Sequence, residues 1–519
     1  MKVLVAEPLA EEGLALLRAE HEVEVRLDLP RAELLARLPE FDALLVRSQV
    51  KVDAEALAAG SRLLVVGRAG VGVDNIDLDA ATRAGITVVN APTANTIAAA
   101  EHTLALLYAL ARRVPAADAS VRRGEWKRAQ FMGQELRGRT LGIVGLGRIG
   151  MAIADRARAM EMELLGSDPY LTEEMAAVHG VRLVALEQLL READAITLHV
   201  PLTRATRGMI GAPELALMKP GAFVINVARG GVVDEAALAD ALAAGRLGGA
   251  AIDVYEHEPP TDSPLLGAPH TVLTPHLGAS TEEAQAKVAV ETVGQVLEVL
   301  AGRPARYAVN APLLPADTAA ELAPWLSLAR TLGMLYAQFA PSLEGVTLEL
   351  AGDAAEMESG PLSAAALSGL LEPGSEGRVN PINAPLLARE RGLALAERKS
   401  TDSARYQSLL SISGSSRVGG TVLGGEPRIV RLADYWLDMP PARWMLVTRH
   451  QDKPGTMGRI GLTLGEADVN ISAMHLGRSA PRADALMVLA LDEPVPDEVA
   501  ASIRRHEALL DLWLIHLPA

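Results

Sequence analysis

The sequence predicts an α/β protein of several domains, and three observations lead to this prediction. The chain has 519 residues, and at roughly 100 to 200 residues per domain this length favours three or four domains. As far as the helical pattern that ends at Leu300, short apolar strands alternate with helical patterns, which is typical of parallel sheets covered by helices. The C-terminal stretch follows a different order, βαββαβ, which is typical of a small ferredoxin-like domain.

The first α/β region runs from the start of the chain to about Val89. Helical patterns such as Glu11–Ala19 separate its strands. The predicted strands are short and apolar: Val3–Ala6, Val23–Leu27, Ala43–Val46, Leu63–Val66 and Thr87–Val89. A long helix over Ile97–Arg112, after the polar pair Asn95-Thr96, leads into the next region.

The second α/β region begins at Thr140 and ends with a helix predicted over Ala284–Leu300. Its strands recur roughly every 25 to 35 residues, which is the spacing of βα repeats. The predicted strands are Thr140–Val144, Leu164–Ser167, Ala195–His199, Phe223–Val227, Ala250–Val254 and Thr271–Leu273.

Beyond residue 300 the composition changes twice. Gly302–Pro315 is rich in Pro and Ala and is predicted to be a linker. Residues 316–438 alternate helical Ala/Leu stretches with Gly/Ser-rich turns, among them Ser411–Gly420. The tail then gives strands Trp444–Thr448, Val469–Leu476, Ala485–Leu491 and Asp511–Leu517, with helices Met457–Glu466 and Asp497–Arg505.

Composition and charge limit the partners. Lys and Arg number 49 and Asp and Glu 65, so the net charge is −16, which argues against nucleic acid or an anionic membrane as a partner. The absence of cysteine excludes disulfides, thiolate metal sites and cysteine nucleophiles, and no metal site is predicted. Neither a signal peptide nor an apolar run of about 18 residues is present, so we expect a cytoplasmic protein.

A glycine motif follows the predicted strand Thr140–Val144 and opens a helix. In this motif Gly145 suits a tight turn, Gly147 a close approach to a pyrophosphate, and Gly150 close helix packing. Asp168 ends the next strand and suits the ribose hydroxyls, while its charge would repel a 2′-phosphate. The motif therefore predicts a Rossmann-type domain that binds NAD in preference to NADP.

Three polar side chains follow later strands of the same region. Because ligands bind at the carboxyl ends of strands in such sheets, we expect these side chains to lie close together. His276 suits a base that takes the proton of an alcohol, Glu258 can hold its second ring nitrogen, and Arg229 can grip a carboxylate. His257, beside Glu258, is the rival base, and each residue taken alone has a structural alternative such as a surface ion pair or a helix cap.

These segments resemble the D-isomer-specific 2-hydroxyacid dehydrogenases over nearly the whole chain. The segments that carry the resemblance are Val46–Ser48, Val66–Asn75, Gly145–Gly150, Val227–Gly231 and His276–Thr281. The resemblance implies that Arg229, Glu258 and His276 are the catalytic trio. It also implies that NAD contacts Arg148, Ile149, Asp168, Val227, Ala228, Asp253, Gly278 and Ala279, besides the motif glycines.

The resemblance further implies the substrate 3-phospho-D-glycerate, held by Arg47, Arg68 and Asn75 of the first region. Arg128 is similar to an arginine that a neighbouring subunit supplies, which implies a homo-oligomer, a dimer or a tetramer; a surface arginine is the alternative. Val71 stands where relatives often carry threonine. Two other functions stay open: a dehydrogenase for glycerate, lactate or 2-hydroxyglutarate, and a non-catalytic NAD sensor resembling a co-repressor.

The tail resembles an ACT domain, an amino-acid-sensing module. The resemblance implies L-serine as effector, with His450, Asp452, Gly455 and Asn470 as candidate ligands; the alternative is a structural dimerisation domain. The middle segment resembles the intervening domain of the long members of the family, and its arginines 417, 428 and 431 are equally compatible with an anionic effector or with solvent. The implied domains are 1–97 with 284–305 (substrate), 98–283 (NAD), 316–440 (α+β, intervening) and 443–519 (ACT).

Overall fold

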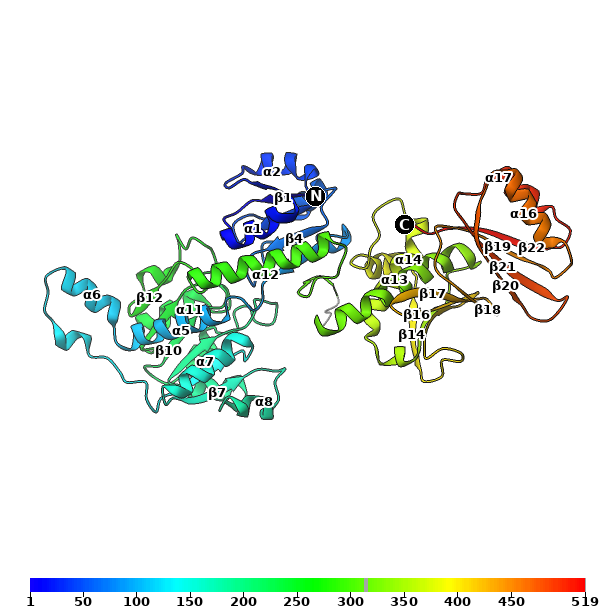
Figure 1. Cartoon of the computed structure of the whole chain (residues 1–519). Helices are drawn as coiled ribbons and strands as arrows, with labels where there is room; N and C mark the ends of the chain where they lie inside the picture. Colours follow the sequence, from blue (N-terminus) through cyan, green and yellow to red (C-terminus); the bar gives the residue numbers. More distant parts are fainter. Residues whose placement is uncertain (312–315, 519) are drawn as a thin grey trace.

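The computed structural model describes residues 1–311 and 316–518, which form four sheets with their helices along an elongated chain (Figure 1). Residues 312–315, at the end of the predicted linker, and Ala519, at the end of the predicted ACT domain, lie outside the described residues. The first two sheets are parallel throughout, which confirms the α/β prediction. Within the described residues, no helix has the length and apolar character needed to span a membrane.

The first sheet has the flavodoxin-like strand order β2-β1-β3-β4-β5. Its strands are β1 (Lys2–Val5), β2 (Glu22–Val25), β3 (Ala43–Val46), β4 (Val65–Arg68) and β5 (Thr87–Asn90). The helices between them are α1 (Glu11–Glu20), α2 (Arg31–Arg37), α3 (Ala54–Ala59) and α4 (Leu78–Arg83). β4 starts two residues later than predicted, because the buried Leu63 belongs to a turn whose amide donates to Gly60.

The second sheet has the order β12-β11-β10-β9-β6-β7-β8, so the order reverses between β6 and β9, as in Rossmann folds. Its strands are β6 (Thr140–Val144), β7 (Glu163–Ser167), β8 (Arg182–Leu183), β9 (Ala195–Leu198), β10 (Phe223–Asn226), β11 (Gly249–Ile252) and β12 (Thr271–Leu273). Its helices are α5 (Thr96–Ala111), α7 (Arg148–Ala159), α8 (Glu173–Val178), α9 (Leu186–Glu192), α10 (Ala212–Leu217) and α11 (Glu235–Ala243). α6 (Val114–Arg122) and the 3-10 turn Arg128–Phe131 form an arm that extends away from the sheets (Figure 1).

The chain crosses from the first sheet to the second and later returns to the first. α5 leads from β5 into the second sheet, and α12 (Glu282–Leu300) returns and packs against α1 and β4 (Figure 1). A Cβ on Gly13 of α1 would lie 2.9 Å from the Cβ of Ala289, so glycine allows the close approach of these two helices. The second sheet is therefore built from residues that lie between β5 and α12 in the sequence, while the elements on both sides belong to the unit of the first sheet.

After α12 the chain lies along β5, at the edge of the first sheet. The amide of Val309 donates to the carbonyl of Val88 at 2.7 Å, and Ala308 forms an antiparallel bridge with Val89. The side chain of Asn310 accepts from the amide of Val88 at 2.9 Å and donates to the carbonyl of Ile86 at 2.9 Å. The open edge of β5 is thereby paired with the segment 308–310.

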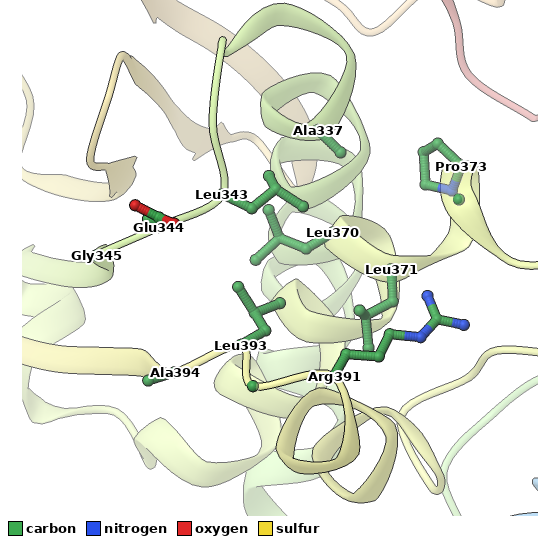
Figure 2. A pocket seen from close by; sticks show the side chains of 12 residues that line it. Ala337, Leu343, Glu344, Gly345, Leu370, Leu371, Pro373, Arg391, Leu393 and Ala394 are labelled. Atoms are coloured by element: carbon green, nitrogen blue, oxygen red, sulfur yellow. The ribbon is translucent and has the colours of Figure 1, made fainter.

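The third sheet is mixed, with the order β14-β13-β15-β16-β17-β18. Its strands are β13 (Val346–Gly352), β14 (Leu395–Ser400), β15 (Ser408–Ser413), β16 (Arg417–Leu423), β17 (Glu426–Leu432) and β18 (Tyr435–Met439), and its helices are α13 (Ala316–Phe339), α14 (Ser359–Leu371) and α15 (Ala384–Glu390). The prediction of a turn over Ser411–Gly420 is wrong, because most of that segment belongs to β15 and β16. Its small residues serve packing: a Cβ on Gly420 would lie 2.6 Å from Leu328 of α13. A cavity of about 590 Å³ lies where α14 and α15 end (Figure 2).

In the third unit, the segment from Arg378 to Asn383 contacts the loops of the first sheet. Arg378 donates to the carbonyl of Leu63, Asn380 to the carbonyl of Gly85 at 2.7 Å, and Asn383 to the carbonyl of Arg83 at 3.4 Å. These bonds attach the third unit to the turns that precede β4 and β5.

The fourth sheet confirms the βαββαβ prediction and has the ferredoxin-like order β20-β21-β19-β22. Its elements are β19 (Trp444–Gln451), α16 (Thr456–Glu466), β20 (Ile471–Arg478), β21 (Asp484–Leu491), α17 (Asp497–Arg504) and β22 (Leu509–His516). One face of this sheet, with Val447 and Val488, shares a buried cluster with Leu335 of α13, so the third and fourth units pack on a common core.

Candidate active site

The glycine loop lies between β6 and α7, at the point where the strand order reverses. Gly145 has a φ of 90°, and a Cβ there would lie 2.6 Å from the carbonyl oxygen of His199, so the turn requires glycine. A Cβ on Gly150 would lie 2.2 Å from the carbonyl of Gly145. A Cβ on Gly147 would instead point into open space. The loop therefore leaves room for a pyrophosphate against the free amides of the first turn of α7, which begins with Arg148 and Ile149.

Asp168 follows β7 and lies beside the glycine loop. Its Oδ2 accepts the amide of Leu146 at 2.9 Å, and its Oδ1 accepts the amide of Tyr170 at 2.9 Å. Both amides hold the carboxylate at the loop. This position fits the ribose hydroxyls of NAD and opposes the extra phosphate of NADP.

The loop after β10 carries Val227, Ala228 and Arg229. Asn226 holds it from both sides, since its Nδ2 donates to the carbonyl of Arg229 at 3.0 Å and its Oδ1 accepts the amide of Ala228 at 3.1 Å. A Cβ on Gly230 would lie 1.8 Å from the carbonyl oxygen of Tyr255. Glycine at this position therefore brings the Arg229 loop against the loop that carries Glu258.

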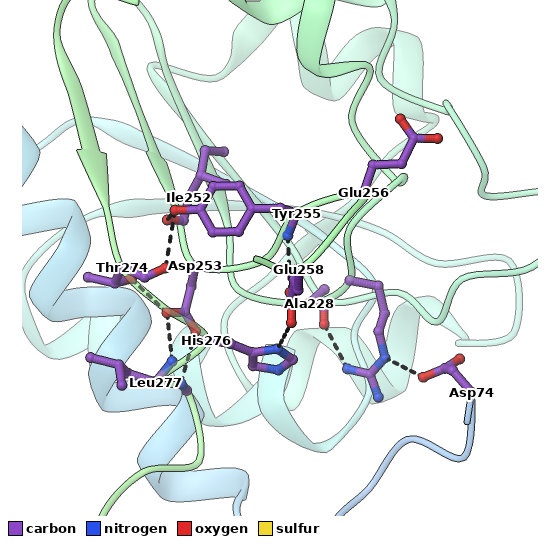
Figure 3. Close-up of polar contacts among 12 residues, drawn as sticks. Asp74, Ala228, Ile252, Asp253, Tyr255, Glu256, Glu258, Thr274, His276 and Leu277 are labelled. Atoms are coloured by element: carbon purple, nitrogen blue, oxygen red, sulfur yellow. Dashed lines mark hydrogen bonds and ion pairs between the residues drawn. The ribbon is translucent and has the colours of Figure 1, made fainter. Parts of the chain in front are cut away.

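His276 and Glu258 form the predicted pair (Figure 3). Nδ1 of His276 lies 2.9 Å from Oε2 of Glu258, and Oε1 of Glu258 accepts the amide of Tyr255 at 3.1 Å. Burial alone would raise the pKa of Glu258, but the hydrogen bond and charge of His276 outweigh it and hold the pKa below its ordinary value. His276 has a φ of 58°, an uncommon conformation for a side-chain-bearing residue. The rival base His257 is exposed and makes no hydrogen bond to Glu258.

Asp253 is fully buried beneath the His276 loop. Its oxygens accept the amides of Leu277 at 2.8 Å and Gly278 at 2.9 Å, and the hydroxyl of Thr274 at 2.6 Å (Figure 3). Nε2 of His102, on α5, lies 3.2 Å from the same carboxylate. Burial alone would raise the pKa of Asp253, but these hydrogen bonds keep it below its ordinary value. Asp253 therefore holds the His276 loop as an ionised carboxylate.

Gly278 and Ala279 continue the His276 loop and fix its position relative to neighbouring elements. A Cβ on Gly278 would lie 3.0 Å from Cγ1 of Val227, so the His276 loop packs against the Arg229 loop. The carbonyl of Ala279 accepts the side chain of Gln285 at 2.7 Å, which ties this loop to α12. The residues expected to border NAD thus come together around the carboxyl ends of β6, β7, β10, β11 and β12.

Arg229 reaches across to the first unit. Its Nε lies 3.1 Å from Oδ2 of Asp74, and its Nη1 donates to the carbonyl of Ala228 at 2.7 Å (Figure 3). A Cβ on Gly72 would lie 2.2 Å from Nη2 of Arg229, so glycine admits the guanidinium against the loop after β4. Nη2 takes part in neither of these two contacts, so its two N–H groups can donate to a ligand.

Arg47 and Arg68 lie at the ends of β3 and β4. Burial, followed by the nearby charge of Arg229, lowers the pKa of Arg68 to about 10, and Arg47 adds to the repulsion. Nε of Arg68 is buried without a hydrogen-bond partner among the described residues. A bound anion would relieve this crowding of positive charge. Asn75 has a different position from the one expected of a ligand, since its Nδ2 donates to the carbonyls of Arg47 and Val50 at 3.0 and 2.7 Å.

Two groups of predicted residues do not join the site within one chain. Arg128 is exposed on the arm, which extends away from the two sheets (Figure 1). In the tail, Asp452 lies beside the first residue of β21, because Gln451 pairs with Asp484, whereas Asn470 precedes Ile471, which pairs with Leu491. Seven residues of strand separate these positions, roughly 24 Å. Asp452 and Asn470 therefore cannot contact the same serine molecule within a single chain.

The remaining tail residues have distinct surroundings. His450 is buried, which lowers its pKa, and its Nδ1 lies 3.3 Å from the hydroxyl of Thr448. Gly455 has a φ of 90° and forms the N-cap of α16. Asn470 donates from Nδ2 to Asp492 at 2.6 Å.

Sequence reasoning missed three functional contacts, those of Asp74, His102 and Asn226. Asp74 lies inside the segment Val66–Asn75, but its partner Arg229 is far away in the sequence. His102 is one histidine in a predicted helix, and no spacing signal connects it with Asp253. Only the folded chain shows that these residues face the catalytic loops.

Comparison with known families gives two matches. Residues 104–278 match the family described as D-isomer specific 2-hydroxyacid dehydrogenase, NAD binding domain. Residues 321–433 match the D-3-phosphoglycerate dehydrogenase intervening domain.

Curated proteins and solved structures agree with these matches. The chain is 45% identical to the D-3-phosphoglycerate dehydrogenase of Synechocystis sp., covering 99% of this chain and 95% of that protein. It is 42% identical to the protein of the same name from Archaeoglobus fulgidus, with both chains fully covered. Among solved structures, D-lactate dehydrogenase of Aquifex aeolicus with NAD and lactic acid matches at 29% identity and a TM-score of 0.53, covering 58% of this chain and 96% of that one.

Proposed function

The chain belongs to the D-3-phosphoglycerate dehydrogenase family, and from that premise we propose that Arg229, Glu258 and His276 catalyse the NAD-dependent oxidation of 3-phospho-D-glycerate to 3-phosphooxypyruvate. This reaction is the first step of L-serine biosynthesis. The observation that carries the residue roles is the 2.9 Å pair of His276 and Glu258, placed beside the loop of Arg229. NAD, when bound, would accept the hydride from C2, the carbon that carries the hydroxyl group.

Proton transfer falls to His276. Because Nδ1 is bound to Glu258, Nε2 is the ring nitrogen that takes the proton of the C2 hydroxyl. The Glu258 carboxylate, ionised at neutral pH, then stabilises the imidazolium and fixes the tautomer of the ring. Arg229 binds the substrate carboxylate through Nη2 and polarises the C2 oxygen, while Asp74 and the Ala228 carbonyl hold its other nitrogens.

Selectivity for an acid with a second anionic group comes from Arg47 and Arg68. In a chain with a net charge of −16, three guanidiniums lie near one another, and one of them, Arg68, is half-buried and repelled by the other two. Such a field favours a small ligand with two acidic groups over lactate or glycerate.

A substrate panel tests the proposal directly. We expect kcat/KM with NAD to be highest for 3-phospho-D-glycerate among that acid, glycerate, lactate and 2-hydroxyglutarate. We expect His276→Asn to lose most of its turnover while NAD affinity stays unchanged. Turnover confined to an unphosphorylated acid would contradict the substrate assignment, and an Asn variant as fast as wild type would contradict the mechanism.

A homo-oligomer is part of this proposal. The arm exposes large apolar side chains, with Trp126 and Met132 at 76% and 78% exposure, and a second copy would bury them. Arg128 on the same arm would then reach the partner's substrate site. Light scattering gives the mass, and Arg128→Ala should raise KM for substrate without changing the mass. A monomer by light scattering would contradict this assembly. We also propose that the protein acts in the cytoplasm.

L-serine is proposed as the effector of the tail. Because His450, Asp452 and Gly455 lie at one end of the fourth sheet and Asn470 at the other, one serine can meet both sets only between two copies of the domain. Calorimetry on the full chain should show serine binding that Asn470→Ala weakens. No binding heat at millimolar serine would refute this role.

We propose four functional units with the boundaries inferred from the sequence. Residues 1–97 with 284–305 hold the substrate, 98–283 hold NAD, 316–440 form the intervening unit and 443–519 the sensing unit. The sheet assignments and the family matches at 104–278 and 321–433 support this division.

A further inference from the structure

A buried carboxylate at the end of β1 holds the loop that carries Arg47. The side chain of Glu7 belongs to a residue that is only 6% exposed. Its Oε2 accepts the amide of Arg47 at 2.6 Å and the amide of Val50 at 3.1 Å, while its Oε1 accepts the amide of Gln49 at 3.1 Å. Both oxygens are therefore bound to main-chain donors of one loop.

The same loop is held by its carbonyls as well. Asn75 donates to the carbonyls of Arg47 and Val50, and its own carbonyl accepts the amide of Val52 at 2.9 Å. Glu7 thus fixes the amide side and Asn75 the carbonyl side. The main chain from Arg47 to Val50 has little freedom left, although Ser48 and Gln49 are exposed.

The charge of Glu7 matters in addition to its geometry. Glu7 lies close enough to Arg68 to favour its charged form, against the opposing effects of Arg229 and Arg47. The buried Glu7 side chain therefore lies near the guanidiniums to which the proposed function assigns substrate binding. Its oxygens remain bound to amides, so it does not compete with a substrate anion for the guanidiniums.

We propose that Glu7 is a positioning residue for substrate recognition, which sets the direction of Arg47 by holding the main chain of residues 47–50. This inference rests on the proposed function, in which Arg47 binds the substrate. Glu7 itself does not touch the substrate. Its effect is confined to the affinity for the anionic acid and leaves the hydride and proton steps to the other unit.

The substitution Glu7→Gln tests this role directly. Three amides face two oxygens, so replacing one oxygen by an NH2 group sets donor against donor and removes at least one of the three bonds. For Glu7→Gln we expect KM for 3-phospho-D-glycerate to rise about tenfold, equivalent to about 1.4 kcal/mol. The kcat at saturating substrate and the Kd for NAD should stay within about twofold of wild type, since neither depends on Arg47.

Asp42→Asn is the matched control. Asp42 is also a buried carboxylate of the first sheet, and it accepts the amide of Lys2 at 2.7 Å at the opposite end of β1. This variant should lose thermal stability but keep KM. An equal rise of KM in both variants would mean that Glu7 serves only the stability of the sheet, and would overturn the proposal.

A double-mutant cycle separates this inference from the proposed function. If Glu7 acts through Arg47, then Glu7→Gln should add nothing to the KM of Arg47→Ala. A full additive effect would overturn the role of Glu7 while leaving Arg47 as a ligand. If Arg47→Ala itself leaves KM unchanged, the proposed substrate role of Arg47 fails first.

Hydrogen exchange on the wild-type protein gives a readout that needs no variant. The amide of Gln49 belongs to an exposed residue, and we expect it to exchange slowly because Glu7 accepts it. Exchange as fast as in an open loop would show that the carboxylate does not hold this segment, and would overturn the proposal.

Discussion

Replacing Glu258 by glutamine isolates the charge behind the catalytic histidine. The carboxylate lies 2.9 Å from Nδ1 of His276, and two unit charges at that separation attract by about 1.4 kcal/mol in water and about 6 kcal/mol at an effective dielectric of 20. The two side chains are 39% and 45% exposed, so solvent screening favours the lower end. Hydrogen bonds to charged groups contribute about 1.5–3 kcal/mol. We therefore expect Glu258→Gln to lower kcat by roughly 10 to 30-fold.

The pH profile gives the second readout. Because the carboxylate is ionised at neutral pH, its removal makes the imidazolium less stable, and the acid limb of kcat should move to lower pH. The control is Glu256→Gln, which removes an exposed charge two residues away and should change neither quantity. Steady-state rates of NAD reduction over a pH series measure both. An unchanged limb together with a kcat within twofold of wild type would refute the role of Glu258 as the partner of His276.

Three further predictions concern the cofactor, the packing and the acid stability. Asp168→Ser should raise the Kd for NAD and improve the use of NADP, by about tenfold in the ratio of kcat/KM values, since the repelling charge is gone; an unchanged ratio would contradict the ribose assignment. Gly230→Ala should lower the free energy of unfolding by about 1–3 kcal/mol and reduce kcat, because its Cβ would strike the Tyr255 carbonyl, whereas Gly267→Ala, in open space, should change little by denaturant titration. Burial lowers the pKa of His199 to about 3 from an unfolded value near 6.5, so the unfolded state binds a proton at a higher pH than the folded state does. The free energy of unfolding should therefore fall by about 2 kcal/mol as the pH drops from about 8 to about 5. The variant His199→Gln should show a weaker dependence of this free energy on pH.

Much of the fold follows from local patterns in the sequence. The apolar runs near Val3, Ala43 and Thr140 are strands because each is short and bounded by turn residues, and period and spacing were enough to place them. The segment Ser411–Gly420 has the composition of a turn but forms strands, because its small residues allow α13 to pack closely, and composition does not reveal this tertiary contact.

In the candidate site, too, some residues can be predicted from local sequence patterns, whereas others depend on tertiary contacts. Gly145, Asp168 and His276 stand next to strand ends, so their grouping follows from the geometry of parallel sheets. The contact between Arg229 and Asp74 joins residues of two different units, and the contact between His102 and Asp253 joins a helix to a distant strand end. Neither relation leaves a trace in the spacing of the sequence, because both depend on how the two sheets face each other.

The pairing of residues 308–310 with β5 has a practical consequence for shortened forms of the chain. A fragment ending near residue 302 would keep every residue of the catalytic trio but would bare the outer strand of the first sheet, whose free amides and carbonyls invite pairing with another molecule. A fragment ending at residue 311 would keep that strand covered. The two fragments should therefore differ in aggregation rather than in chemistry, and the longer one is the suitable starting point for a minimal dehydrogenase.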